Sequence, residues 1–212
     1  MLKLYGAPLS NYYNMVKISL LEKRLPFEEV LRPPTQEEEY LVKSPMGKIP
    51  TLETERGFIT ETHAILDYLE DAYPRPSFLP ADPFARAKAR EMTQAMELYI
   101  ELVARRGFGV LFGRPVPDDV KAGIKPDLVK GVAALKRLLQ FKPWVAGQDM
   151  SYADFVLYYT LALGNLSAKA NADMDLVAEL GAQEWHTRMA ARDSVKKADA
   201  AADAFRKAMA RG

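Results

Sequence analysis

The chain has 212 residues, with 29 lysines and arginines against 28 aspartates and glutamates and a formal net charge of +1. Such an even balance gives no sign of a nucleic acid or an anionic membrane as partner, and no apolar run approaches the roughly 20 residues that span a bilayer. There is no cysteine, which excludes disulfides, thiolate metal ligands and CxxC redox chemistry. The only histidines, His63 and His186, lack the spacing of metal ligands, so we expect no metal site.

The first 75 residues or so alternate between strand and helix patterns. We predict a strand over residues 2–6, a helix over 10–25, a strand over 27–31, a hairpin over 51–60 and a helix over 65–73. The order β-α-β-loop-β-β-α is that of a small α/β layer. The N-terminus enters a strand pattern directly and lacks the long apolar core of a signal peptide, so we expect a cytoplasmic protein.

The sequence pattern changes after this α/β layer. Prolines at 74, 76, 80 and 83 fall within ten residues and predict a stiff linker. Beyond residue 84 only Ala-, Leu- and Met-rich helical patterns remain. We therefore expect an α/β domain over residues 1–78 and an all-helical domain over residues 84–212.

One helix start in the second half has a specific signal. Ser151 precedes an apolar run and Asp154 follows three residues later, the spacing of a capping box. Such a cap contributes on the order of 1 kcal/mol to stability. Because no histidine accompanies the pair, we interpret it as a folding signal and not as a catalytic one.

Three blocks of sequence together resemble the cytosolic glutathione transferase family. The first runs from Leu4 through Ser10 to Glu28, and the second is SPMGKIPTL at 44–52 followed by ET, AI and YL from Glu61 to Leu69. The third is W-AG-S-AD, from Trp144 to Asp154. They occur in the family's order over most of the chain, and they imply a thioredoxin-like first domain followed by an all-helical domain that lines the pocket for an electrophile.

The second block implies a glutathione site. By the resemblance, Ile49 pairs with the cysteinyl part of glutathione beside a cis bond to Pro50, Glu61 and Thr62 receive the γ-glutamyl end, and Lys48 adds a polar contact. From the residues alone, plainer interpretations stand beside this one. An X-Pro bond is cis in only about 5–6% of cases, and an acid with a hydroxyl residue often does no more than begin a helix.

Two hydroxyl groups compete to activate the glutathione thiol. Ser10 lies between the first strand and the first helix, where serine-type members of the family keep a catalytic serine. Tyr5 lies near the end of the first strand, where tyrosine-type members keep their phenol. We favour Ser10, although a serine at that place also serves as a helix N-cap without any chemistry.

The resemblance implies a transferase that conjugates the glutathione thiolate, its co-substrate, to a hydrophobic electrophile, in a homodimer. Alternatives that share the site are a glutathione-dependent isomerase, peroxidase or dehalogenase. From another class, the alternative is a non-catalytic relative that binds ligands or partners. A thioredoxin-like redox protein is disfavoured because the chain has no cysteine.

Overall fold

The computed structural model describes residues 1–210, which form two compact units: residues 1–77 together with those from 191 onward, and residues 78–190. The two residues that end the predicted helical domain, 211–212, lie outside the described part. The first unit comprises β1 (Leu2–Gly6), α1 (Asn11–Glu22), β2 (Phe27–Leu31), α2 (Glu38–Leu41), β3 (Thr51–Thr54), β4 (Gly57–Thr60), α3 (Thr62–Ala72) and α10 (Asp193–Met209). The second comprises α4 (Pro83–Met96), the π-helix η1 (Glu97–Glu101), α5 (Leu102–Arg105), the 3-10 helix η2 (Phe108–Phe112), α6 (Asp118–Leu138), α7 (Tyr152–Ala172), α8 (Leu176–Glu179) and α9 (Gln183–Ala190).

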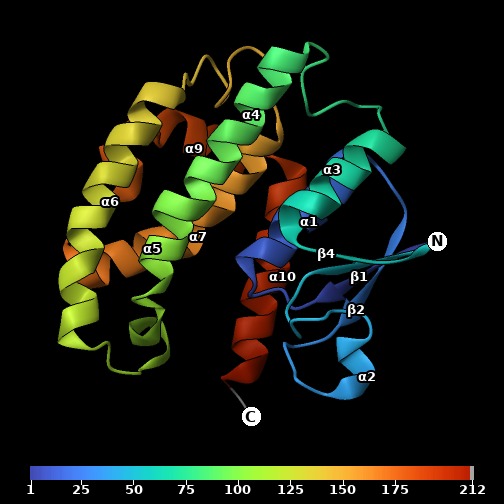
Figure 1. Ribbon diagram of the computed structural model, residues 1–212, viewed down its shortest axis with the longest axis horizontal. Coiled ribbons are helices and arrows are strands. Elements are labelled where there is room, and N and C mark those ends of the chain that lie inside the picture. Colours follow the sequence, from blue (N-terminus) through green and yellow to red (C-terminus); the bar gives the residue numbers. More distant parts are fainter. Residues whose placement is uncertain (211–212) are drawn as a thin grey trace. The chain divides into compact units, whose positions relative to one another are not determined.

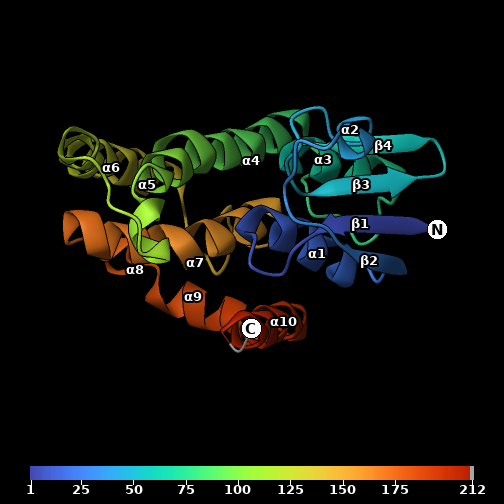
Figure 2. The ribbon, with the colours of Figure 1, turned by 90° about the horizontal axis from the view of Figure 1, so that it is seen from below.

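The first unit is built on a four-stranded sheet with the strand order β2-β1-β3-β4 (Figure 2). β1 pairs in parallel with β2 and antiparallel with β3, and β3 and β4 form the predicted hairpin. Leu4 of β1 and Leu52 of β3 lie opposite each other and are fully buried. In Figure 1, α1 and α3 lie on one side of this sheet and α2 on the other. The result is the thioredoxin-like layer that the sequence predicts.

The short helix α2 was not predicted, since its acidic residues indicated an exposed connection. Only Tyr40 of this helix is buried. Its hydroxyl lies 3.1 Å from Thr51 Oγ1 and donates to the Lys48 carbonyl oxygen at 3.2 Å. The helix is therefore held by contacts with residues 8 and 11 positions further along the chain, which its own local pattern does not reveal.

The second unit is helical throughout, as predicted. α7 is buried on nearly all sides, which explains its largely apolar composition. The helical segment from α4 to α5 is interrupted by the π-helix η1. Gly131 of α6 packs against this turn, since a Cβ added to Gly131 would lie 2.3 Å from the Tyr99 carbonyl oxygen. Among residues 1–210, no helix combines the length and apolarity needed to cross a bilayer.

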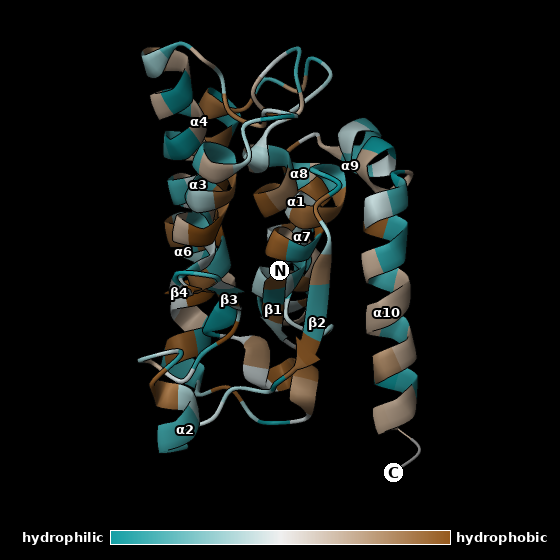
Figure 3. Cartoon of the chain, turned by 90° about the vertical axis from the view of Figure 1, so that its right-hand side faces the viewer, coloured by the Kyte–Doolittle hydropathy of each residue, from teal (hydrophilic) through white to brown (hydrophobic). Residues whose placement is uncertain are grey.

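The position of α10 differs from the sequence-based expectation. We expected the last helix within the helical domain, but α10 packs against α1 in the first unit. Arg192 donates to both carboxylate oxygens of Glu22 at 2.6 and 2.7 Å, and the Ser194 hydroxyl donates to the same carboxylate. Val195, Ala198 and Ala202 form the buried face of α10. Figure 3 shows hydrophilic and weakly hydrophobic residues alternating along this helix, so its burial rests on small side chains and on the Glu22 contacts.

Candidate functional site

Strand register brings the predicted site residues to one end of the sheet. Thr51 of β3 pairs with Tyr5 of β1 on one side and with Thr60 of β4 on the other. The residues that follow Tyr5, precede Thr51 and follow Thr60 must therefore lie at the same end. These are the β1–α1 loop that ends at Ser10, the segment Lys48–Ile49–Pro50 and the pair Glu61–Thr62.

The peptide bond between Ile49 and Pro50 is cis, as the family resemblance implies. The chain that leads into it is fixed by two hydrogen bonds to the Lys48 carbonyl oxygen, from Ser44 Oγ at 2.8 Å and from the Tyr40 hydroxyl at 3.2 Å. Pro50 is buried, Ile49 is half-buried and Lys48 is exposed. The Ile49 backbone thus lies at the end of the sheet, just before β3 begins, where a peptide ligand can pair with it.

Glu61 has an unusual backbone conformation. Its φ is +65° and its ψ is 117°, at the N-cap position of α3. A non-glycine residue in such a sparsely populated region costs of order 1–3 kcal/mol and is typical of functional sites. The Glu61 side chain is exposed and makes no capping hydrogen bond, while Thr62 behind it is buried. The carboxylate therefore does not serve the helix that it precedes.

Ser10 is the N-cap of α1, with an extended backbone at φ −79° and ψ 119°. Its Oγ accepts a hydrogen bond from the Tyr13 backbone amide at 3.3 Å. This bond uses a lone pair and leaves the hydroxyl hydrogen for donation to another group. The N-terminus of a helix also favours a nearby anion, so capping and anion binding are compatible at this residue.

Two phenols near this end of the sheet are paired with carboxylates. The Tyr5 hydroxyl donates to Glu53, and burial together with this hydrogen bond raises the pKa of Tyr5 to about 12. The Tyr13 hydroxyl donates to Glu29 at 2.6 Å, and burial and that hydrogen bond likewise raise the pKa of Tyr13. Sequence reasoning missed both pairs. Glu53 and Glu29 lie on strands next to β1, but the arrangement of strands and of α1 that brings each to its tyrosine is not evident before the fold is known.

Comparison with known proteins identifies the family. A model of the glutathione S-transferase N-terminal domain matches residues 4–77, and a model of the C-terminal domain matches residues 117–198. A glutathione S-transferase of Pseudomonas putida is 47% identical over 180 residues, which cover 84% of this chain and 82% of the relative. This chain belongs to the glutathione S-transferase family.

Other proteins similar to this glutathione S-transferase include one with a different name and one with a solved structure. FtsZ-localized protein A of Caulobacter vibrioides is 33% identical over 72% of each chain. Among solved structures, a glutathione S-transferase of Methylobacterium radiotolerans in complex with glutathione sulfonate is 25% identical, with a TM-score of 0.77 and 93% of each chain covered.

Within residues 1–210, no cluster of three or more histidine, cysteine or acidic residues is arranged to hold a metal ion.

Proposed function

We propose that this enzyme, a glutathione transferase with glutathione as its co-substrate, activates the thiol through Ser10 and transfers it to a hydrophobic electrophile. The observation that carries the proposal is the meeting of the Ser10 loop, the cis Ile49–Pro50 segment and the Glu61–Thr62 pair at one end of the sheet. A helix N-terminus, an available backbone edge and a carboxylate are the groups that a tripeptide with two carboxylates, an ammonium and a thiol requires.

The glutathione backbone would lie along this edge. The Ile49 backbone pairs with the cysteinyl residue, as an added strand does. Glu61 takes the γ-glutamyl ammonium, while the Thr62 hydroxyl and the N-terminus of α3 take the adjoining carboxylate. Lys48, exposed beside the same edge, adds a further polar contact. The strained backbone of Glu61 supports this assignment, because it serves no capping purpose within the protein.

One hydrogen bond from Ser10 is enough for thiol activation. A free thiol has a pKa near 8.5, so only a few per cent is ionised at neutral pH. A hydrogen bond to a charged group contributes roughly 1.5–3 kcal/mol, and each pKa unit corresponds to about 1.36 kcal/mol. Donation by Ser10 would therefore lower the thiol pKa by about one to two units, to roughly 6.5–7.5, so that about a quarter to three quarters of the thiol is ionised at pH 7. No general base is needed.

Tyr5 is the less suitable donor. Its hydroxyl already donates to Glu53, and its pKa is raised to about 12. A thiolate would have to displace a carboxylate from that hydroxyl, and the two anions would then repel each other. Ser10 has no such competitor, since its hydroxyl accepts from the Tyr13 amide and keeps its own hydrogen.

Difference ultraviolet absorption with glutathione, followed across pH, tests the proposal. We expect a thiolate band that saturates with glutathione and persists at neutral pH. Ser10→Thr should keep the band, because threonine retains both the hydroxyl and the ability to cap. Ser10→Gly should raise the thiol pKa by about one to two units, yet a glycine N-cap lowers stability by only a few tenths of a kcal/mol. Tyr5→Phe is the matched control and should leave the band unchanged.

The outcomes separate the rival functions. Saturable glutathione binding without a thiolate band would favour a non-catalytic binding protein, an alternative that the likeness to FtsZ-localized protein A keeps in view. A band that survives Ser10→Gly but disappears in Tyr5→Phe would overturn the Ser10 assignment. With the band established, turnover of aryl halides, enones, peroxides and cis double-bond isomers would distinguish conjugation from reduction and isomerisation.

We propose further that the protein is a cytoplasmic homodimer, since glutathione keeps thiols reduced in the cytosol and soluble oligomers are usually two-fold symmetric. We assign the dimer contact to the segment from α4 to α5, which has two kinds of apolar residue. Met92 and Met96 are buried within the second unit, whereas Leu98, Tyr99 and Leu102 are 48%, 51% and 42% exposed. The exposed set is the candidate contact. Light scattering coupled to size exclusion should give twice the monomer mass for the wild type and the monomer mass for Tyr99→Asp.

A further inference from the structure

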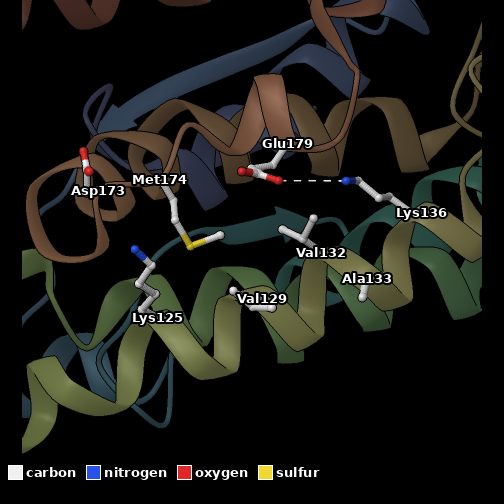
Figure 4. A pocket seen from close by; sticks show the side chains of 8 residues that line it. All are labelled: Lys125, Val129, Val132, Ala133, Lys136, Asp173, Met174 and Glu179. Carbon is white, nitrogen blue, oxygen red and sulfur yellow. Dashed lines mark ion pairs between the residues drawn. The ribbon is translucent and has the colours of Figure 1, made fainter.

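A groove in the second unit is lined by none of the residues assigned to glutathione. It has a volume of about 290 Å³ and runs between α6 on one side and the turn after α7 with α8 on the other (Figure 4). Its middle is apolar, formed by Val129, Val132, Ala133 and Met174. Pockets for drug-sized ligands begin at about 300 Å³, so this groove suits a molecule of one or two rings.

The apolar wall is open to a ligand. Val132 and Met174 are only 4% and 6% exposed, but Val129 beside them is 51% exposed. In Figure 4 the thioether of Met174 points across the groove toward the valines of α6. A methionine sulfur makes favourable contacts with aromatic rings and adapts to their shape. The wall therefore favours an aromatic body over a flexible polar one.

The two ends of the groove differ in how their lysines are paired. At one end Lys136 of α6 forms an ion pair with Glu179 of α8 at 3.9 Å. At the other end Lys125 lines the groove, and among residues 1–210 it makes no ion pair. Asp173 lies near Lys125, but its carboxylate points away from Lys125 in Figure 4. Among the described residues, the Lys125 ammonium thus stands beside the apolar floor without a direct carboxylate partner.

We propose that this groove binds a small aromatic monocarboxylate. The ring lies on Val132 and Met174, and the carboxylate accepts hydrogen bonds from the Lys125 ammonium. A single negative charge matches the single available lysine, whereas a phosphate dianion would place its second charge near Asp173. The site shares no residue with the glutathione site, because every residue that lines it belongs to the helical unit.

Binding of 2-naphthoate to the full-length protein, measured by calorimetry and by saturation-transfer NMR with glutathione present in excess, tests this inference. The neutral analogue 2-naphthamide is the ligand control. We expect saturable binding of naphthoate and binding of the amide about tenfold weaker, the ratio that one charge-assisted hydrogen bond provides. Lys125→Met should weaken naphthoate by the same factor and leave naphthamide unchanged. Lys130→Met removes an exposed lysine of α6 that does not line the groove, and it should leave the affinity for both compounds unchanged.

Two further variants separate charge from shape. Asp173→Asn should tighten naphthoate binding, because it removes the nearest negative charge. Ala133→Phe should abolish binding of both compounds by filling the groove, and Ala133 is exposed, so the fold tolerates the change. The inference is overturned if naphthoate fails to bind, if Lys125→Met binds it as the wild type does, or if excess glutathione displaces it.

Discussion

Replacement of Asp154 by alanine should be among the most destabilising changes in the second unit. The Asp154 carboxylate is completely buried at the start of α7, within the predicted capping box. It accepts hydrogen bonds from the backbone amides of Val145 at 2.9 Å and Ser151 at 2.8 Å, from the indole of Trp185 at 2.8 Å and from the Ser151 hydroxyl at 3.3 Å. Alanine would leave these four buried donors without this acceptor. Each such group costs about 1–3 kcal/mol, and since such costs do not add fully, we expect a loss of about 3–5 kcal/mol.

Urea unfolding followed by tryptophan fluorescence measures this loss. Ser151→Ala is the matched control, because it removes only the N-cap side chain and should cost about 0.5–2 kcal/mol. A loss of 3–5 kcal/mol is a large part of the 5–15 kcal/mol typical of a folded protein. If Asp154→Ala costs no more than Ser151→Ala, the carboxylate acts only as a helix cap, and the argument from its contacts with Val145 and Trp185 is wrong.

Three further predictions concern other parts of the chain. Glu61→Gln should raise the KM for glutathione about tenfold or more in steady-state kinetics, since it weakens a charge-assisted bond, while the thiolate band keeps its pH midpoint; an unchanged KM would remove Glu61 from the site. Gly131→Ala should lower the free energy of unfolding by about 1–3 kcal/mol in thermal or urea unfolding, because its Cβ would meet the Tyr99 carbonyl oxygen at 2.3 Å. Gly123→Ala should be neutral or stabilising, because no described atom lies within 4 Å of the added Cβ. Burial raises the pKa of Glu22, but hydrogen bonds from its arginine and serine partners outweigh this and hold the pKa below its ordinary 4.5. The stabilisation by the ionised Glu22 carboxylate is present above about pH 4.5 and is lost as the pH falls through the pKa of Glu22 in the folded protein. The difference in unfolding free energy between wild type and Glu22→Gln should therefore vanish in acid. A difference that stays constant with pH would contradict the stabilising role of the Glu22 carboxylate.

The sheet and its order along the chain were predictable from the sequence, because its strands alternate and its turns contain glycine or proline. Leu2 and Leu4 alternate with polar or paired residues, and the hairpin turn at Gly57 has a positive φ of 126°. The features that were not predicted depend on contacts between residues that belong to different elements. Tyr40 stabilises α2 through bonds to Lys48 and Thr51, and no local pattern encodes them.

The candidate site was predictable in part, and only through resemblance. Composition and spacing alone favour a trans bond before Pro50 and a plain helix start at Glu61. The family motif predicts the cis bond, and the structure has it. The competition between Ser10 and Tyr5 needed the sheet register, since the Tyr5–Glu53 pair exists only because β1 and β3 are neighbours.

The pairing of Glu22 with Arg192 joins residues 170 positions apart. A ribosome releases the chain from its N-terminus, at about 5–20 residues per second, so α10 can cover α1 only after the second unit has been synthesised. A chain that stops after residue 190 would contain every residue predicted to contact glutathione, yet it would expose the face of α1 that α10 covers. The first unit is therefore completed only by residues that follow the second unit in the sequence.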